Sequence, residues 1–269
     1  MGTVKTSNTL PSIREIRTVI VTAAEEEIIP RFVDAVRAYK ADGSIVTEAD
    51  LRMQARIHEV CESSWPDYAF LGEEMTEAQH EDLLENTETG LWCVDPLDGT
   101  SNFACGIPFF SVSVALLVRG KPQLGVVYDP VRHECFSAVR GEGAWLNGQP
   151  LQVPQFSPPI NKCIASIDFK RLDGEMRQKL CTPPYGSQRN FGSSALEWCW
   201  LAAGRFHLYL HGGQKLWDYS AGSLILQEAG GFACQLDGRD FFPEHFDVAS
   251  VVASTNWSLF ETWKDWLNS

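Results

Sequence analysis

Two aspartates three residues apart, Asp95 and Asp98, form the part of the chain best suited to chemistry. Carboxylates at this spacing, with the backbone carbonyl of Leu97 between them, suit hard divalent cations such as Mg2+. Asp98-Gly99 is a turn pair, and a short helix beginning near Thr100 leaves backbone N–H groups that suit a phosphate. A metal ion beside a phosphate is the arrangement that phosphoryl transfer requires.

The elements around this turn must hold the two carboxylates in place. The apolar run 91–94 predicts a buried strand, and we expect that strand to stop at Pro96, which cannot donate to a sheet ladder. Thr100 or Ser101 is the expected cap of the following helix. The alternative is an ordinary Asp-Gly turn without a ligand, so the other acidic residues of the chain decide between the two.

Further acids stand at the ends of other predicted elements. Glu73 and Glu74 follow a glycine at the end of the predicted strand 68–71, and Asp218 stands at the start of a predicted helix. Adjacent acids are common on surfaces, and an aspartate at a helix start is ordinarily an N-cap. Combined with the central turn, the first two become candidates: Glu73 as a metal ligand, and Glu74 as a neighbour that positions water.

Three motifs together resemble one family. Residues 95–100 resemble the first signature of the inositol monophosphatase family of Mg2+-dependent, lithium-sensitive phosphatases. Residues 72–74 resemble its upstream acidic pair, and residues 217–222 are similar to its second signature. The resemblance extends from about Thr47 to about Gly231, and three motifs in order are far more specific than any one of them.

The resemblance implies a site that holds two or three Mg2+ ions. It implies that one metal lowers the pKa of a bound water, which attacks phosphorus in line without a covalent enzyme intermediate. Thr100, with Glu73 or Glu74, would orient that water. The implied metal ligands and catalytic residues are Glu73, Glu74, Asp95, the Leu97 carbonyl, Asp98, Thr100 and Asp218.

The family also has a mobile loop and an acid near a weaker metal position in the region of residues 40–50. Lys40, Asp42 and Asp50 are the candidates here. For Lys40 and Asp42 a solvated loop is favoured over a functional role, whereas for Asp50 a capping box with Thr47 is an equally good explanation.

The substrate contacts follow from the resemblance as well. Family members hold the organic part of the substrate at a helix start like the one at 192–195, although Ser194 and Glu197 also form a capping box there. Enzymes for inositol phosphate typically carry a Glu seven residues before the second-signature Asp, where this chain has His211, which can also bind a hydroxyl. The expected substrate contacts are Gly99, Thr100, Gly192, Ser193, Ser194, His211 and Asp218.

We therefore expect a Mg2+-dependent phosphomonoesterase for a small phosphorylated polyol such as inositol 1-phosphate. The alternatives within the family are a histidinol-phosphate phosphatase and a 3'(2'),5'-bisphosphate nucleotidase. A non-catalytic alternative is a regulatory binding protein on the same fold, as some relatives are on the transcription machinery.

The composition restricts partners and compartment. With a net charge of −13, nucleic acid and anionic membranes are not expected as partners, whereas bound cations would invert the local field for an anionic substrate. The eight cysteines form no C-x-x-C pair, and the longest apolar run, 114–118, is too short to span a bilayer. We expect a cytoplasmic protein, and a homodimer by analogy with the family.

At 269 residues, with 44% hydrophobic and 21% charged residues, the chain has an ordinary globular composition. The strand-rich stretch 111–139 predicts an antiparallel sheet, and the Pro-rich stretch 155–159 separates it from an alternating second part. The resemblance implies an α+β fold, a layered αβαβα sandwich. We expect an antiparallel sheet in an N-terminal half (1–155) and a mixed sheet in a C-terminal half (156–269).

Overall fold

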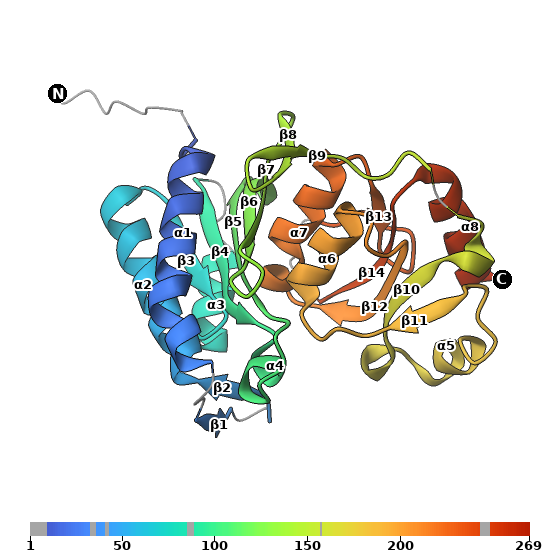
Figure 1. The fold of residues 1–269 in the computed structure, drawn as a ribbon. Helices are drawn as coiled ribbons and strands as arrows, with labels where there is room; N and C mark the ends of the chain where they lie inside the picture. Colours follow the sequence, from blue (N-terminus) through green and yellow to red (C-terminus); the bar gives the residue numbers. More distant parts are fainter. Residues whose placement is uncertain (1–9, 33–35, 41–42, 85–88, 157, 243–247) are drawn as a thin grey trace.

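The computed structural model describes residues 10–32, 36–40, 43–84, 89–156, 158–242 and 248–269. Five layers stack across the molecule (Figure 1). Helices α1 (Ile13–Glu27) and α2 (Glu48–Ser64) pack on a first sheet, α6 (Ser194–Ala202) and α7 (Leu216–Glu228) fill the middle, and α8 (Trp257–Asn268) packs on a second sheet. The expected αβαβα sandwich is confirmed.

The first sheet has seven strands in the order β3-β4-β5-β6-β7-β8-β9. Its strand pairs are antiparallel except for the parallel pair β3 and β4. The strands are β3 (Ala69–Gly72), β4 (Leu91–Asp98), β5 (Ser111–Val118), β6 (Lys121–Asp129), β7 (Glu134–Val139), β8 (Gly143–Leu146) and β9 (Gln149–Leu151).

The second sheet has five strands in the order β11-β10-β12-β14-β13 and is mixed, as expected. Strand β10 runs parallel to β11 and β12, and β14 runs antiparallel to β12 and β13. The strands are β10 (Ile164–Asp168), β11 (Ser187–Arg189), β12 (Leu208–Gln214), β13 (Phe232–Cys234) and β14 (Ala249–Ser254). The division of the chain at 155/156 stays a prediction.

Shorter elements border the two sheets. Strands β1 (Arg37–Tyr39) and β2 (Ile45–Thr47) form an antiparallel pair. The remaining elements are the helices α3 (Glu77–Leu84), α4 (Thr100–Ala104) and α5 (Gly174–Lys179), and the 3-10 turns η1 (Ile29–Arg31), η2 (Ile160–Lys162) and η3 (Phe169–Arg171).

The two middle helices are buried on nearly all sides because a sheet lies on each side of the layer that they form. They approach each other closely: a Cβ on Gly222 of α7 would lie 2.4 Å from the Cβ of Trp198 on α6. A Cβ on Gly125 of β6 would likewise lie 2.9 Å from the Cα of Ala221. Glycine at these positions lets α7 sit tightly against both neighbours, which fixes the N-terminus of α7 at the site.

One local prediction is wrong. The strand does not stop at Pro96, because β4 continues to Asp98. The pairing of β4 with β5 changes register between Asp95 and Asp98. This irregularity accommodates Pro96, which has no N–H to donate to the neighbouring strand. The bulge turns the strand end so that both carboxylates reach the same pocket. Among the described helices, none combines the length and apolar character that a membrane crossing requires.

Candidate active site

A pocket of about 490 Å³ opens where the end of β4 meets the starts of α4, α6 and α7 and the turn η3. Most of the residues singled out in the sequence line it: Glu73, Asp95, Leu97, Asp98, Gly99, Thr100, Gly192, Ser194, His211 and Asp218. Glu74 and Ser193 do not line it. Ser193 is buried, and the side chain of Glu74 is only 5% exposed.

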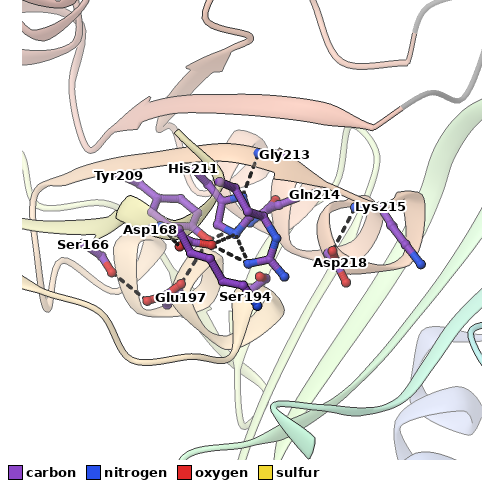
Figure 2. A network of polar contacts seen from close by, with 12 residues as sticks. Ser166, Asp168, Ser194, Glu197, Tyr209, His211, Gly213, Gln214, Lys215 and Asp218 are labelled. Atoms are coloured by element: carbon purple, nitrogen blue, oxygen red, sulfur yellow. Dashed lines mark hydrogen bonds and ion pairs between the residues drawn. The ribbon is translucent and has the colours of Figure 1, made fainter. Parts of the chain in front are cut away.

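Three carboxylates gather at one end of this pocket. One oxygen each from Asp95, Asp98 and Asp218 lies within 4.8 Å of the others. The backbone N–H of Leu97 donates to Asp95 Oδ1 at 3.0 Å, which orients that side chain at the bulge. Asp218 stands in the first turn of α7, where the N–H of Lys215 donates to its Oδ2 at 2.8 Å (Figure 2).

The electrostatics of this cluster favour a bound cation. Burial, followed by the charges of neighbouring acids that include Glu73, raises the pKa of Asp95 well above its usual value. Burial raises the pKa of Asp98 to about 6, and burial together with the charge of Asp98 raises the pKa of Asp218 to about 8. Such raised values mean that the ionised cluster lacks a counter-charge. An all-oxygen donor set of this kind fits Mg2+.

Asp98 is held by the start of α6. Its carboxylate accepts hydrogen bonds from Ser193 Oγ (2.5 Å), Ser194 N (3.1 Å) and Ala195 N (2.7 Å). These donors belong to the first turn of the helix, whose free N–H groups and dipole favour a carboxylate there. The bonds join a residue of the first sheet to a helix about a hundred residues later in the chain.

The predicted cap of α6 is therefore wrong. The helix begins at Ser194 with Ser193 as its N-cap, and the Ser193 side chain makes no capping bond because it donates to Asp98. Glu197 also turns away from the helix start. It accepts from Ser166 Oγ (2.6 Å), Tyr209 OH (3.0 Å) and the backbone N–H of Phe191 (3.0 Å), the two side-chain bonds being shown in Figure 2.

The Glu197 cluster continues into the middle layer. Gln214 Nε2 donates to Tyr209 OH at 2.6 Å, and Trp198 Nε1 donates to Gln214 Oε1 at 2.9 Å. Burial raises the pKa of Glu197 to about 7. Because Phe191 directly precedes Gly192, this buried network fixes the backbone of the loop that borders the pocket.

Thr100 is paired with an acid from another helix. Its Oγ1 lies 2.9 Å from Asp50 Oδ1 and 2.9 Å from the carbonyl oxygen of Leu97. The capping box predicted for α2 is confirmed, since Thr47 N and Oγ1 donate to Asp50 Oδ2 at 2.8 and 2.6 Å. Asp50 thus caps a helix with one oxygen and accepts from Thr100 with the other.

The cap of α4 is Gly99, not Thr100 or Ser101 as predicted. Its φ of 94° lies in the left-handed region, which favours glycine. A Cβ on Gly99 would also lie 3.1 Å from the carbonyl oxygen of Phe109 and 3.2 Å from that of Gly192. The turn after Asp98 therefore requires glycine both for its conformation and for its space.

Lys40 is close to the acidic pair at the end of β3. Its Nζ lies 3.1 Å from Glu73 Oε1 and 2.6 Å from Glu74 Oε1. Burial raises the pKa of Glu74 to about 7. The backbone N–H of Glu74 donates to Gln54 Oε1 at 2.9 Å. Glu73 remains on the pocket wall, and Asp42, the other loop candidate, lies outside the described residues.

His211 is bound within the protein through both ring nitrogens. Strands β10 and β12 pair so that Asp168 and His211 are register partners, and His211 Nε2 lies 3.0 Å from Asp168 Oδ2 (Figure 2). The N–H of Gly213 donates to His211 Nδ1 at 3.1 Å, so Nδ1 is an acceptor and Nε2 carries the proton. Burial lowers the pKa of His211, which favours this neutral form.

Asp168 also binds the turn that follows it. The guanidinium of Arg171 forms an ion pair with Asp168 Oδ2, and the N–H of Lys170 donates to Oδ1 at 2.9 Å. Burial opposes ionisation of this carboxyl, but the bonds from His211 and Arg171 prevail and hold the pKa of Asp168 below its usual value. Asp168 is therefore an anion with three donors around it.

Between residues 168 and 197, five residues of the pocket wall were not assigned to the site from the sequence. A visible signal for three of them was the charged stretch 168–171 directly after the predicted strand 163–167, where strand ends commonly carry functional residues. Glu197 was predicted to take part in a helix capping box, and no feature of the sequence indicated a role for Asn190. The five are Asp168, Lys170, Arg171, Asn190 and Glu197.

Comparisons with known proteins agree on one family. The model of the inositol monophosphatase family matches residues 12–265. A protein named Nus factor SuhB from Pasteurella multocida is 38% identical over 212 residues, which cover 76% of this chain and 77% of that protein. An inositol monophosphatase from Mesembryanthemum crystallinum is 36% identical over 223 residues, covering 80% of this chain and 81% of that one.

Solved structures agree as well. The structure of an IMPase/NADP phosphatase complexed with Mg2+ and phosphate superimposes with a TM-score of 0.81 and 25% sequence identity, covering 95% of this chain and 96% of the other. The family match extends over nearly the whole chain and includes every element that lines the pocket. The chain belongs to the inositol monophosphatase family.

Proposed function

We propose that this protein is a Mg2+-dependent phosphomonoesterase that hydrolyses a small phosphorylated polyol. The observation that carries the proposal is the cluster of Asp95, Asp98 and Asp218, whose oxygens lie within 4.8 Å of one another in a pocket of about 490 Å³. The family membership supports the same reaction class, and one relative of the same fold was solved with Mg2+ and phosphate.

The residues that would hold the metal are the three clustered aspartates, Glu73 and the carbonyl of Leu97. Bound Mg2+ supplies Lewis-acid stabilisation of the phosphoryl oxygens and lowers the pKa of a water nucleophile. The contribution of the protein is to hold the metal ligands in fixed positions. The three hydrogen bonds to Asp98 and the bond from Leu97 N to Asp95 fix these carboxylates before substrate arrives.

Thr100 and Asp50 are placed to handle the proton of the attacking water. A threonine hydroxyl donates one hydrogen bond and accepts others, so Thr100 accepts from water while it donates to Asp50. Asp50 is buried, and the bonds from Thr47 hold it in place. Because the water attacks directly and in line, the mechanism uses no covalent intermediate on the protein.

The backbone N–H groups of Gly99 and Thr100 are the proposed phosphate contacts, next to Asp98. Gly192 and Ser194 line the wall where the organic part of the substrate would lie. The Ser193 hydroxyl donates to Asp98, and the His211 ring donates to Asp168. Neither side chain is therefore assigned a direct substrate contact in this proposal. Glu74 neutralises Lys40 behind Glu73.

A substrate panel tests the proposal. Purified protein with Mg2+ is given inositol 1-phosphate, histidinol phosphate and a nucleoside 3',5'-bisphosphate, and released phosphate is measured with and without a chelator. We expect phosphate release that is abolished by the chelator. Absence of Mg2+-dependent release from every phosphomonoester would contradict the proposal.

A regulatory binding role is the second candidate, because one relative carries the name Nus factor SuhB. The intact carboxylate cluster favours catalysis, although a second role is compatible with it. All eight cysteines are free thiols, which supports a reducing, cytoplasmic setting for either role. A homodimer is expected from the family, and light scattering of the purified chain tests it.

A further inference from the structure

We propose that His80 of α3 is a positioning residue that holds Glu73 and Asp218 in the relative position that a metal site between them requires. His80 is not among the described residues that line the pocket. The inference rests on the proposed function, because it concerns the Mg2+ site on which that function depends. The observation that carries it is that one imidazole contacts the residue directly before each of these two acids.

The first contact fixes the peptide group that leads into Glu73. The Nε2 atom of His80 lies 2.8 Å from the carbonyl oxygen of Gly72, which also accepts from Met75 N at 3.1 Å. A carbonyl oxygen can only accept, so Nε2 carries the proton and donates. The N–H of the same peptide group belongs to Glu73 and donates to the carbonyl oxygen of Val94 at 3.0 Å. This peptide group is therefore held by α3 at one end and by β4 at the other, which fixes the direction in which the Glu73 side chain leaves the backbone.

The second contact reaches the start of α7. The imidazole of His80 packs against the indole of Trp217, with ring centroids 4.9 Å apart and an angle of 51° between the ring planes. Trp217 directly precedes Asp218 and is 7% exposed. Its backbone carbonyl accepts from Ser113 Oγ on β5 at 3.2 Å. His80 therefore packs on a residue that is anchored to the first sheet and that leads directly into Asp218.

The two acids need such a connection because they come from different layers. Glu73 follows β3, the edge strand of the first sheet beside which α3 packs (Figure 1), and Asp218 lies in the first turn of α7 in the middle layer. Burial, then the charges of Asp98 and Glu73, raise the pKa of Asp218 to about 8, so both acids act on the same site. Mg2+ requires near-octahedral geometry with oxygens at about 2.0–2.1 Å, and a small displacement of one ligand lowers its affinity. A side chain that contacts both elements opposes that displacement.

The alternative explanation is that His80 only attaches α3 to the rest of the protein. Every residue of α3 is exposed or half-buried, so the helix depends on contacts of this kind. An attachment could use any residue of the strand, however, whereas both partners of His80 directly precede a proposed metal ligand. His58 of α2 provides the comparison: it packs on Phe70 of β3 with ring centroids 4.6 Å apart, and Phe70 precedes no proposed ligand directly.

Titration of substrate-free protein with Mg2+ in a calorimeter tests the inference without turnover. We expect His80→Ala to raise the Kd for Mg2+ roughly tenfold, the lower end of the effect that contacts supporting metal ligands commonly have. His58→Ala is the matched control, because it also removes an imidazole from an aromatic partner next to β3, and it should leave this Kd unchanged. An unchanged Kd in His80→Ala, or an equal rise in His58→Ala, would overturn the inference.

Two conservative variants separate the two contacts and disturb α3 less than alanine does. His80→Gln keeps an N–H donor for the carbonyl of Gly72, and His80→Phe keeps a ring against Trp217. Each should raise the Kd for Mg2+ less than His80→Ala, and urea unfolding of the metal-free proteins is measured alongside. If the three variants were less stable but bound Mg2+ with the Kd of the unaltered protein, His80 would only anchor α3 and the inference would be wrong.

Steady-state kinetics give a second measurement that a purely structural role would not affect. In His80→Ala the Mg2+ concentration for half-maximal phosphate release should rise with the Kd. Because His80 is not a pocket residue, kcat at saturating Mg2+ and the KM of the substrate should stay within about threefold. A changed KM with an unaltered Mg2+ dependence would contradict the assignment. If the unaltered protein bound no Mg2+, the proposed function would fail as well, whereas an unaltered Kd in His80→Ala would overturn this inference alone.

Discussion

Ser193 Oγ donates to Asp98 Oδ2 at 2.5 Å, and this bond connects the start of α6 to the end of β4. Two backbone N–H groups of the same helix turn complete the contact. One carboxylate of the cluster is therefore aligned by an element of the middle layer. The precision of the site depends on packing between layers as well as on the turn that carries Asp95 and Asp98.

Ser193→Ala should weaken both metal binding and the fold. Loss of one hydrogen bond to a buried carboxylate costs about 1–3 kcal/mol of stability. Supporting contacts of metal ligands commonly change metal affinity by about 10–100-fold. We expect the Mg2+ concentration for half-maximal phosphate release to rise within that range. Ser258→Ala, an exposed serine on α8, is the control and should change neither quantity.

Thr100→Val should reduce turnover while substrate still binds. The substitution keeps the shape of the side chain but removes the hydroxyl between Asp50 and Leu97. Groups that transfer a proton in the transition state contribute roughly 10²–10⁴-fold, so we expect kcat to fall by at least a hundredfold with little change in KM. Steady-state kinetics check this. A kcat within about threefold of the unaltered protein would remove Thr100 from the mechanism.

Gly99→Ala should destabilise the protein more than Gly106→Ala. Both glycines have positive φ, 94° and 73°, and an L-residue there costs roughly 1–2 kcal/mol. Only Gly99 is crowded, since its Cβ would lie 3.1 and 3.2 Å from two carbonyl oxygens, whereas nothing lies within 4 Å at Gly106. Urea unfolding measures both. Equal losses would mean that the crowding at Gly99 is relieved at no cost.

The stability of the metal-free protein should fall as the pH rises. Folding raises the pKa of Asp98 to about 6 and that of Asp218 to about 8, so the folded state binds more protons than the unfolded state above about pH 4. The stability that these protons provide is present at low pH and is lost as the pH rises through the folded-state values. Thermal unfolding in chelator between pH 5 and 8.5 should show a decreasing midpoint.

Mg2+ should reverse this trend. Protons and the cation compete for the same oxygens, so the increase in unfolding temperature caused by Mg2+ should grow between pH 6 and 8. Asp218→Asn should shrink that increase. If the increase in unfolding temperature caused by Mg2+ were independent of pH, or were unchanged in Asp218→Asn, the ion would have to bind at another site.

Local sequence signals predicted those parts of the site in which the interacting residues are close together in the chain. The capping box of Thr47 and Asp50 spans three residues, and its geometry is the predicted one. The proline rule failed at Pro96, because pairing with β5 tolerates a register change there that sequence alone does not reveal. Ser194 looked like a helix cap, but the bond from Ser193 to Asp98 set the helix start one residue earlier.

Partners far apart in the chain were not predictable in this way. Asp168 and His211 are neighbours only because β10 and β12 pair in parallel with that register. His211 was read as a residue that contacts a hydroxyl, since its bond from Gly213 and its bond to Asp168 depend on the folded sheet. The resemblance to a family supplied the αβαβα layers, which periodicity alone would have left open.

Phosphate release by Asp95→Asn protein tests the central claim most directly. Asp95 is 2% exposed at the centre of the carboxylate cluster, and the amide keeps its size while removing its charge. With unaltered protein as the reference and circular dichroism to verify the fold, we predict Mg2+-dependent turnover lowered by orders of magnitude in a folded protein. Near-normal turnover by the folded variant would contradict the account.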